Sequence, residues 1–122
     1  MADGKNYYSI GKVSALCSVP IKTLRYYDKI GLLVPDYRKD ESNYRYYSQD
    51  QILTLFIIRK LRLLGIPLKE IREIVVSRDS AAMGKCIQER LQGIHQAIAE
   101  LNDQYSEGQM LLERLNTGHS LL

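Results

Sequence analysis

A heptad pattern runs through the last third of the chain. Its apolar residues follow one another at alternating steps of four and three, which places them along one seam of a helix. A helix over residues 80–117 would be about 55 Å long at 1.5 Å per residue, too long to be covered by the rest of a small chain. The pattern therefore predicts a partner helix. The predicted interface residues are Ile87, Leu91, Ile94, Ile98, Leu101, Tyr105, Leu112 and Leu115, with Gly108 as a weak seam position.

The spacing alone leaves the identity of that partner open. Pairing with a second copy of the chain is the economical solution, because both helices would then carry the same apolar seam. An intramolecular hairpin broken near Gly108 is the alternative. The heptads do not distinguish a parallel from an antiparallel coil.

Positive charge and tyrosine are concentrated ahead of the seam. Residues 1–78 contain 14 Lys and Arg against 8 Asp and Glu, a net charge of +6, whereas residues 79–122 contain 3 against 6, a net charge of −3. Eight of the nine tyrosines lie at or before Tyr47. A basic, tyrosine-rich front indicates a polyanion-binding domain, although a merely soluble surface can have the same charge.

Two short helices are predicted near the start of the chain. Ser9 is suited to cap a first helix that carries Ile10 and Val13 at helical spacing. A tight turn over residues 17–19 follows, Pro20 suits the first turn of a second helix, and Gly31 ends it. Two short helices joined by a turn of three or four residues are typical of a helix-turn-helix.

The second of these helices has the side chains of a DNA-reading helix. Lys22 and Arg25 lie three residues apart, and Tyr26 and Lys29 extend the same surface. Cations there can reach phosphates or guanine edges, and the phenol hydroxyl can reach backbone oxygens. Ile21, Leu24 and Ile30 are left to face a core.

A β-hairpin is predicted after Pro35, with extended pieces near residues 37–38 and 44–46. Between them lies a polar turn in which Asn43 tolerates a left-handed backbone. Arg38 and Arg45 would lie on the strands, as in a wing that touches a DNA backbone. The alternative is a capping hairpin whose tyrosines, Tyr44 and Tyr47 among them, pack on the core.

Ser48 and Gln51 form a capping-box signature that opens a helix running to Gly65. This helix is apolar nearly all round, so more than one of its faces is expected to be covered. Arg62 near its end is a predicted DNA contact, although a cationic helix end also compensates the helix dipole. Pro67 starts a further short helix, and the pair would make a second wing.

Metal, cofactor and catalytic sites have no support in the sequence. Cys17 and Cys86 lie far apart without histidines at ligand spacing, and His95 and His119 are isolated. We find no phosphate-binding glycine loop, nucleophile elbow or carboxylate pair, and predict no cofactor and no enzyme. No secretion signal or apolar run long enough for a bilayer is present, which predicts a cytoplasmic protein with no membrane partner.

In this order, the motifs resemble the MerR family of bacterial transcription regulators. The segments are Leu-Arg-Tyr-Tyr-Asp-Lys-Ile-Gly-Leu-Leu-x-Pro, then Tyr-Arg-Tyr-Tyr, then Arg-Leu-Leu-Gly-Ile-Pro-Leu-Lys-Glu-Ile, followed by the long helix. The Asn-Tyr-Arg-Tyr-Tyr wing is most similar to the multidrug-responsive branch. The residues that we predict to contact DNA are Lys22, Thr23, Arg25, Tyr26, Tyr27, Arg45 and Arg62.

The resemblance implies a mainly α fold: a winged helix-turn-helix head with a small β-hairpin wing, followed by a long C-terminal coiled-coil helix. The expected domains are residues 1–78 for DNA binding and 79–118 for an antiparallel homodimer, with 119–122 as a short tail. Each dimer would bind a palindrome in double-stranded promoter DNA and, as an activator, bend and untwist the spacer. RNA polymerase would then be an indirect partner, through the promoter.

Some residues depart from the family pattern. Ser18 stands where glycine is common, Pro20 where a capping serine is common, and Asn43 where glycine usually precedes Tyr-Arg. The sequence ends soon after the long helix, without the cysteine loop of metal sensors or the effector domain of drug sensors. It is thus either a short regulator or a fragment of one.

The leading functional prediction is a dimeric, sequence-specific DNA-binding transcription regulator. The alternatives are a sensor that binds an apolar small molecule, and a coiled-coil interaction module with incidental basic charge. The sequence does not specify the effector, the operator, the target genes, or whether the default action is activation or repression.

Overall fold

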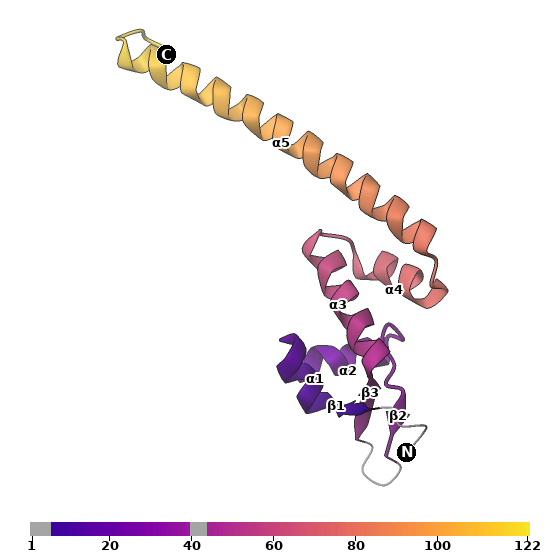
Figure 1. Ribbon diagram of the computed structural model, residues 1–122. Coiled ribbons are helices and arrows are strands. Elements are labelled where there is room, and N and C mark those ends of the chain that lie inside the picture. Colours follow the sequence, from indigo (N-terminus) through magenta and orange to yellow (C-terminus); the bar gives the residue numbers. More distant parts are fainter. Residues whose placement is uncertain (1–5, 40–43) are drawn as a thin grey trace. The chain divides into compact units, whose positions relative to one another are not determined.

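The computed structural model describes residues 6–39 and 44–122 (Figure 1). The chain divides into two compact units, Met1–Met83 and Gly84–Leu122. We call the first unit the head. The polar turn of the predicted hairpin, with Asn43, lies outside the described residues.

The predicted helix-turn-helix is present as α1, Ile10–Cys17, and α2, Ile21–Lys29. Ser9 caps α1, because its hydroxyl oxygen accepts a hydrogen bond from the backbone N–H of Lys12 at 3.2 Å. Ser18 ends α1 in the left-handed conformation, with φ 55°. Pro20 is the N-cap of α2 and makes no side-chain cap, so it lies one position earlier than the sequence suggested.

Glycine is required at the end of α2. Gly31 has φ +73°, a region that side chains rarely adopt. A Cβ there would meet Nη2 of Arg72 at 3.4 Å, an ordinary van der Waals contact, so the backbone conformation and not the space favours glycine. That arginine lies on α4, Leu68–Ser77, and its Nε donates a 2.7 Å hydrogen bond to the carbonyl oxygen of Ile30, the C-cap residue of α2.

The predicted hairpin consists of β2, Tyr37–Arg38, and β3, Arg45–Ser48. A third strand that the sequence did not predict, β1, Tyr7–Ser9, pairs with the other edge of β3, giving the antiparallel order β1-β3-β2. Tyr47 is 1% exposed and packs in the core, while Tyr44 is 58% exposed. The packing alternative is therefore correct for Tyr47.

The capping box at the start of α3, Gln49–Leu63, is confirmed, with reciprocal bonds between Ser48 and Gln51. α3 packs against α1, α4 and β3. Within the head only one of its faces is buried, by Leu55, Ile58 and Leu61, whereas Leu53, Phe56 and Leu63 are 60%, 54% and 76% exposed. The expectation that several faces would be covered does not hold within the head, because α1, α4 and β3 contact α3 but leave these three side chains exposed.

The long helix is present as α5, Ser80–Asn116, 37 residues. None of its residues is buried, and seam residues such as Leu101, Tyr105 and Leu112 are 63%, 69% and 61% exposed. No helix among the described residues is both long enough and apolar enough to cross a membrane.

Candidate nucleic-acid interface

The outer face of α2 carries the predicted reading residues. Lys22, Arg25, Tyr26 and Lys29 occur at helical steps of three, four and seven residues, and all four are exposed. Leu24, at 0% exposure, anchors the opposite face in the core. α2 therefore presents a surface of cations and one phenol, held in place by an apolar inner side. Thr23 lies at the edge of this surface and is half-buried.

Tyr27 does not share that surface. Its side chain is 7% exposed and lies on the inner face, three residues from Leu24. Its backbone carbonyl accepts hydrogen bonds from the N–H groups of Leu32 at 2.9 Å and Leu33 at 3.2 Å, which close the turn after the helix. The structure thus places Tyr27 in the core packing, in contrast to the predicted contact with DNA.

The hairpin β2–β3, which we call the wing, is joined to α2 by one carboxylate. Asp28 accepts from Nη2 of Arg38 at 2.6 and 2.5 Å, through its two oxygens, and from Nε of Arg45 at 2.8 Å. The Asp28 side chain is 7% exposed, while those of Arg38 and Arg45 are 42% and 22% exposed. The two arginines are therefore held at the carboxylate and still reach solvent.

This contact has a clear electrostatic reason. Arg38 and Arg45 are direct cross-strand partners in the sheet, and like charges in that position destabilise a strand pair. Asp28 offsets this repulsion, and the cluster keeps a net charge of about +1. The sequence alone did not predict this role of Asp28. The available signal was a lone carboxylate on a cationic helix, which suggests a partner within the protein.

The three cations near the end of α3 have different surroundings. Arg59 donates a hydrogen bond to the carbonyl oxygen of Cys17, and Nζ of Lys60 lies 5.1 Å from the ring centroid of Phe56. Arg62 is exposed, and over residues 6–39 and 44–122 its guanidinium has no ion-pair partner. Of the three, Arg62 is the one without a hydrogen bond, ion pair or ring contact to another described residue.

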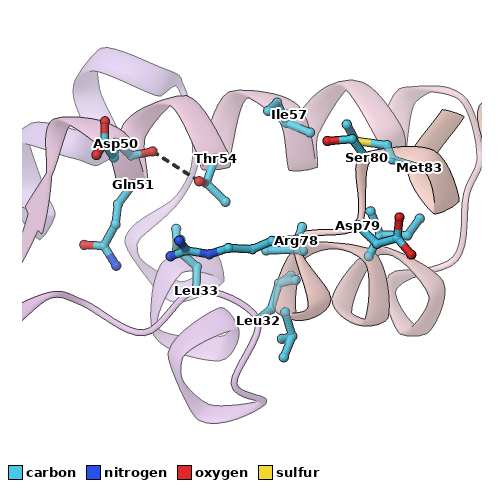
Figure 2. A pocket seen from close by; sticks show the side chains of 13 residues that line it. Leu32, Leu33, Asp50, Gln51, Thr54, Ile57, Arg78, Asp79, Ser80 and Met83 are labelled. Atoms are coloured by element: carbon cyan, nitrogen blue, oxygen red, sulfur yellow. Dashed lines mark hydrogen bonds between the residues drawn. The ribbon is translucent and has the colours of Figure 1, made fainter.

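The head also contains a pocket of about 550 Å³ beside α3 and α4. Figure 2 shows the side chain of Arg78 extending along it toward Leu33, below the hydrogen bond from Thr54 Oγ1 to the Asp50 carbonyl at 3.1 Å. None of the predicted DNA-contacting residues lines the pocket. Among the described residues, no group of three or more His, Cys, Asp or Glu is placed to hold a metal ion.

A helix-turn-helix with an outward cationic face, next to a hairpin that carries two arginines, defines a winged helix-turn-helix DNA-binding protein. The family model for the MerR HTH family regulatory protein matches residues 8–77. A second model, described as MerR, DNA binding, matches residues 52–117. The chain belongs to the MerR family of regulatory proteins.

The relatives give the same assignment. The HTH-type transcriptional regulator ZntR of Escherichia coli (strain K12) is 34% identical over 124 residues, which cover 93% of this chain and 84% of ZntR. The multidrug-efflux transporter 1 regulator of Bacillus subtilis (strain 168) is 48% identical over 69 residues, 57% of this chain and 25% of that protein. These relatives are regulators, and the chain, as a member of their family, is not an enzyme.

Among solved structures, the chain is similar to EcmrR in the EcmrR-DNA complex solved by cryo-electron microscopy. The TM-score is 0.70 at 35% sequence identity, and the match covers 91% of this chain and 40% of the EcmrR chain. The chain spans less than half the length of EcmrR and of the multidrug regulator.

Proposed function

We propose that the protein is a dimeric transcription regulator that binds a palindromic operator in promoter DNA and distorts the spacer between the promoter elements. The observation that carries this proposal is the exposed row of Lys22, Arg25, Tyr26 and Lys29 on α2, opposite a fully buried Leu24. A rigid helix with cations and a phenol on its outer side fits the major groove. Relatives with the same fold have been solved on DNA.

The proposed DNA contacts are of two kinds, those of α2 in the groove and those of the wing and α3 on the flanking backbone. Lys22, Thr23, Arg25 and Tyr26 would approach base edges and the nearest phosphates, because they lie on the outer face and edge of α2. Arg45 in the wing and Arg62 at the end of α3 would contact the flanking backbone. Distortion of the spacer would cost about 1–10 kcal/mol and be offset by contacts that only the bent duplex permits.

Dimerisation would use the seam of α5. In a parallel pair Gly108 would face Gly108, leaving a gap in the seam. In an antiparallel pair centred on Leu101, Gly108 would face Ile94 and the branched side chain would fill the space. Packing therefore favours the antiparallel coil, with the interface residues Ile87, Leu91, Ile94, Ile98, Leu101, Tyr105, Leu112 and Leu115.

We further propose that the regulator acts in the cytoplasm, where its DNA is, and that it belongs to the multidrug-responsive branch. The likeness to the multidrug-efflux transporter 1 regulator and the similar wing sequence support this branch. In that branch the signal would reach the promoter through the coil and the head. RNA polymerase would be affected through the DNA.

The experiment that tests the proposal is selection from genomic DNA. The purified chain is incubated at moderate salt with fragmented genomic DNA of the source organism, and the bound fragments are recovered and sequenced. Enrichment of a palindrome within a promoter spacer is the expected result. A matched selection with Arg25→Gln and Tyr26→Phe together should lose the enrichment. Salt-sensitive recovery without any enriched sequence would reject the regulator in favour of a generic basic surface.

A further inference from the structure

We propose that Asp28 is a positioning residue for DNA binding: it fixes Arg38 and Arg45 of the wing against α2 so that Arg45 meets a phosphate. The inference rests on the proposed function, since it concerns how the wing reaches DNA. It assigns a role to a carboxylate on a surface that, by charge alone, should avoid negative groups.

The geometry of Arg45 carries the argument. Its Nε donates to Oδ2 of Asp28 at 2.8 Å, so the carboxylate occupies one edge of the guanidinium. Over residues 6–39 and 44–122 the Nη groups of Arg45 make no hydrogen bond. A guanidinium held on one edge presents the other in a fixed orientation, and a phosphate binds that edge through two parallel N–H groups.

The surroundings of Asp28 favour a fixed orientation over a loose surface contact. Its side chain is 7% exposed, and it bonds to two cross-strand partners on different strands. An ordered arginine loses less rotamer freedom when it binds than one that moves freely in solvent. Asp28 therefore lowers the entropic cost of the Arg45 contact.

The opposite role makes a distinct prediction. If Asp28 only neutralised the wing and withheld its arginines from DNA, removing the carboxylate would raise the affinity for DNA. If Asp28 positions Arg45, removing it lowers the affinity although the protein becomes more positive. The sign of the effect separates the two roles.

The test measures binding of the full chain to a short fluorescein-labelled duplex of mixed sequence by fluorescence anisotropy, at several salt concentrations. Phosphate contacts form on any sequence, so no operator is needed. We expect Asp28→Asn to weaken binding about tenfold and to lower the slope of log affinity against log salt by about one. The matched control, Asp36→Asn, removes the same charge from an exposed residue of the head and should leave affinity unchanged or slightly raised.

A double-mutant cycle shows whether Asp28 acts through Arg45. Arg45→Gln alone should weaken binding to a similar extent, and Asp28→Asn combined with Arg45→Gln should lie within about twofold of Arg45→Gln. Asp28→Glu, which keeps the carboxylate on a longer arm, should recover part of the affinity. A change in packing alone would not disappear in the Arg45→Gln background.

Each outcome has a defined meaning. Wild-type affinity or tighter binding by folded Asp28→Asn overturns the inference and leaves the proposed function intact. Failure of the wild-type chain to bind any duplex overturns the proposed function and the inference with it. If circular dichroism shows that Asp28→Asn is unfolded, Asp28→Glu decides, since it keeps the charge and moves the carboxylate by one methylene from its bond to Nε of Arg45. A loss of affinity that is absent in the Arg45→Gln background then supports the inference, and wild-type affinity rejects it.

Discussion

Nη1 of Arg59 lies 2.7 Å from the carbonyl oxygen of Cys17 and donates a hydrogen bond to it. Cys17 is the last residue of α1, where backbone carbonyls lack partners within the helix. Arg59 lies on α3, 42 residues later in the sequence. The guanidinium therefore caps the C-terminus of α1, the first helix of the helix-turn-helix, and compensates the negative end of its dipole. Arg62, three residues later, is exposed and makes no such bond to a described residue.

Replacing Arg59 by Met should lower the free energy of unfolding by about 1–2 kcal/mol, because a charged donor is removed from a helix end. DNA affinity should change little. Arg62→Met is the matched control and should do the reverse, weakening DNA binding at unchanged stability. Urea unfolding and anisotropy on the same samples measure both quantities. An Arg59→Met variant as stable as wild type would contradict the capping role.

Replacing Ser18 by Gly should stabilise the head. Ser18 has φ 55°, and a left-handed backbone costs a residue with a Cβ about 1–2 kcal/mol. Glycine avoids this strain, but part of the gain is offset because glycine loses more conformational entropy when the chain folds. We expect a net gain of about 0.5–1 kcal/mol in the free energy of unfolding. Ser18→Ala keeps the Cβ and should bring no gain. Thermal unfolding of the two variants checks the difference, and equal midpoints would refute the strain argument.

Gln51 joins the segment after α2 to the start of α3. Its Oε1 accepts from the N–H groups of Asp36 at 2.9 Å and Ser48 at 3.1 Å, and its Nε2 donates to the Val34 carbonyl. Gln51→Ala should lower the free energy of unfolding by about 2 kcal/mol, because three hydrogen bonds are lost.

Two further variants sharpen this prediction. Gln51→Glu keeps the acceptor, loses the donor to Val34, and should fall between wild type and Gln51→Ala in urea unfolding. Gln49→Ala, at the exposed first position of α3, should change stability by less than about 0.5 kcal/mol. Equal losses at positions 49 and 51 would rule out a special role for Gln51.

Tyr47 has a buried phenol oxygen without a hydrogen-bond partner in the described part of the chain. Burial and, to a lesser extent, the charge of Asp28 raise its pKa above the ordinary value of 10.0. Tyr47→Phe should leave stability at pH 7 unchanged or raise it by up to about 1 kcal/mol, because an unpaired polar group leaves the core.

The same shift in the pKa of Tyr47 determines how the free energy of unfolding depends on pH in alkaline solution. The unfolded tyrosine ionises near 10.0 while the folded one stays protonated. Its contribution to stability is therefore complete below that pH and is lost as the pH rises through the folded pKa. Urea midpoints measured from neutral pH into this window should fall more steeply for wild type than for Tyr47→Phe. Parallel curves would contradict the shift.

Most of the fold follows from local patterns. The capping box at Ser48 and Gln51 predicts the start of α3, and the heptads predict α5 nearly to the residue. The strand β1 was missed because three residues carry no periodicity of their own. β1 forms only through pairing with β3, for example Tyr8 with Tyr47, far along the chain.

The candidate site was predictable to the same extent. Helical spacing puts Lys22 and Arg25 on one face of α2. The same spacing puts Tyr27 beside Leu24 on the inner face, and this position in the helix is a better guide to the burial of Tyr27 than its place in the family motif. The lone carboxylate of Asp28 on a cationic helix indicates a partner within the protein, but not which one, since its partners lie 10 and 17 residues later on the wing. Contacts between residues far apart in the sequence decide which charged side chains are paired within the protein.

The arrangement of the α5 seam can be settled by cysteine cross-linking. In an antiparallel coil centred on Leu101, that residue faces its own copy, whereas Leu91 faces Leu112. In a parallel coil every seam residue faces itself.

With Cys17→Ser and Cys86→Ser as background, Leu101→Cys should form a disulfide-linked dimer under mild oxidation, and Leu91→Cys should not. Cross-linking by both variants would mean a parallel coil, and by neither would argue against a pair centred on Leu101; an intramolecular hairpin broken near Gly108 is already ruled out, because α5 runs unbroken over Ser80–Asn116. Leu91→Cys mixed with Leu112→Cys should cross-link only in the antiparallel pair, because those two positions come within disulfide distance only there.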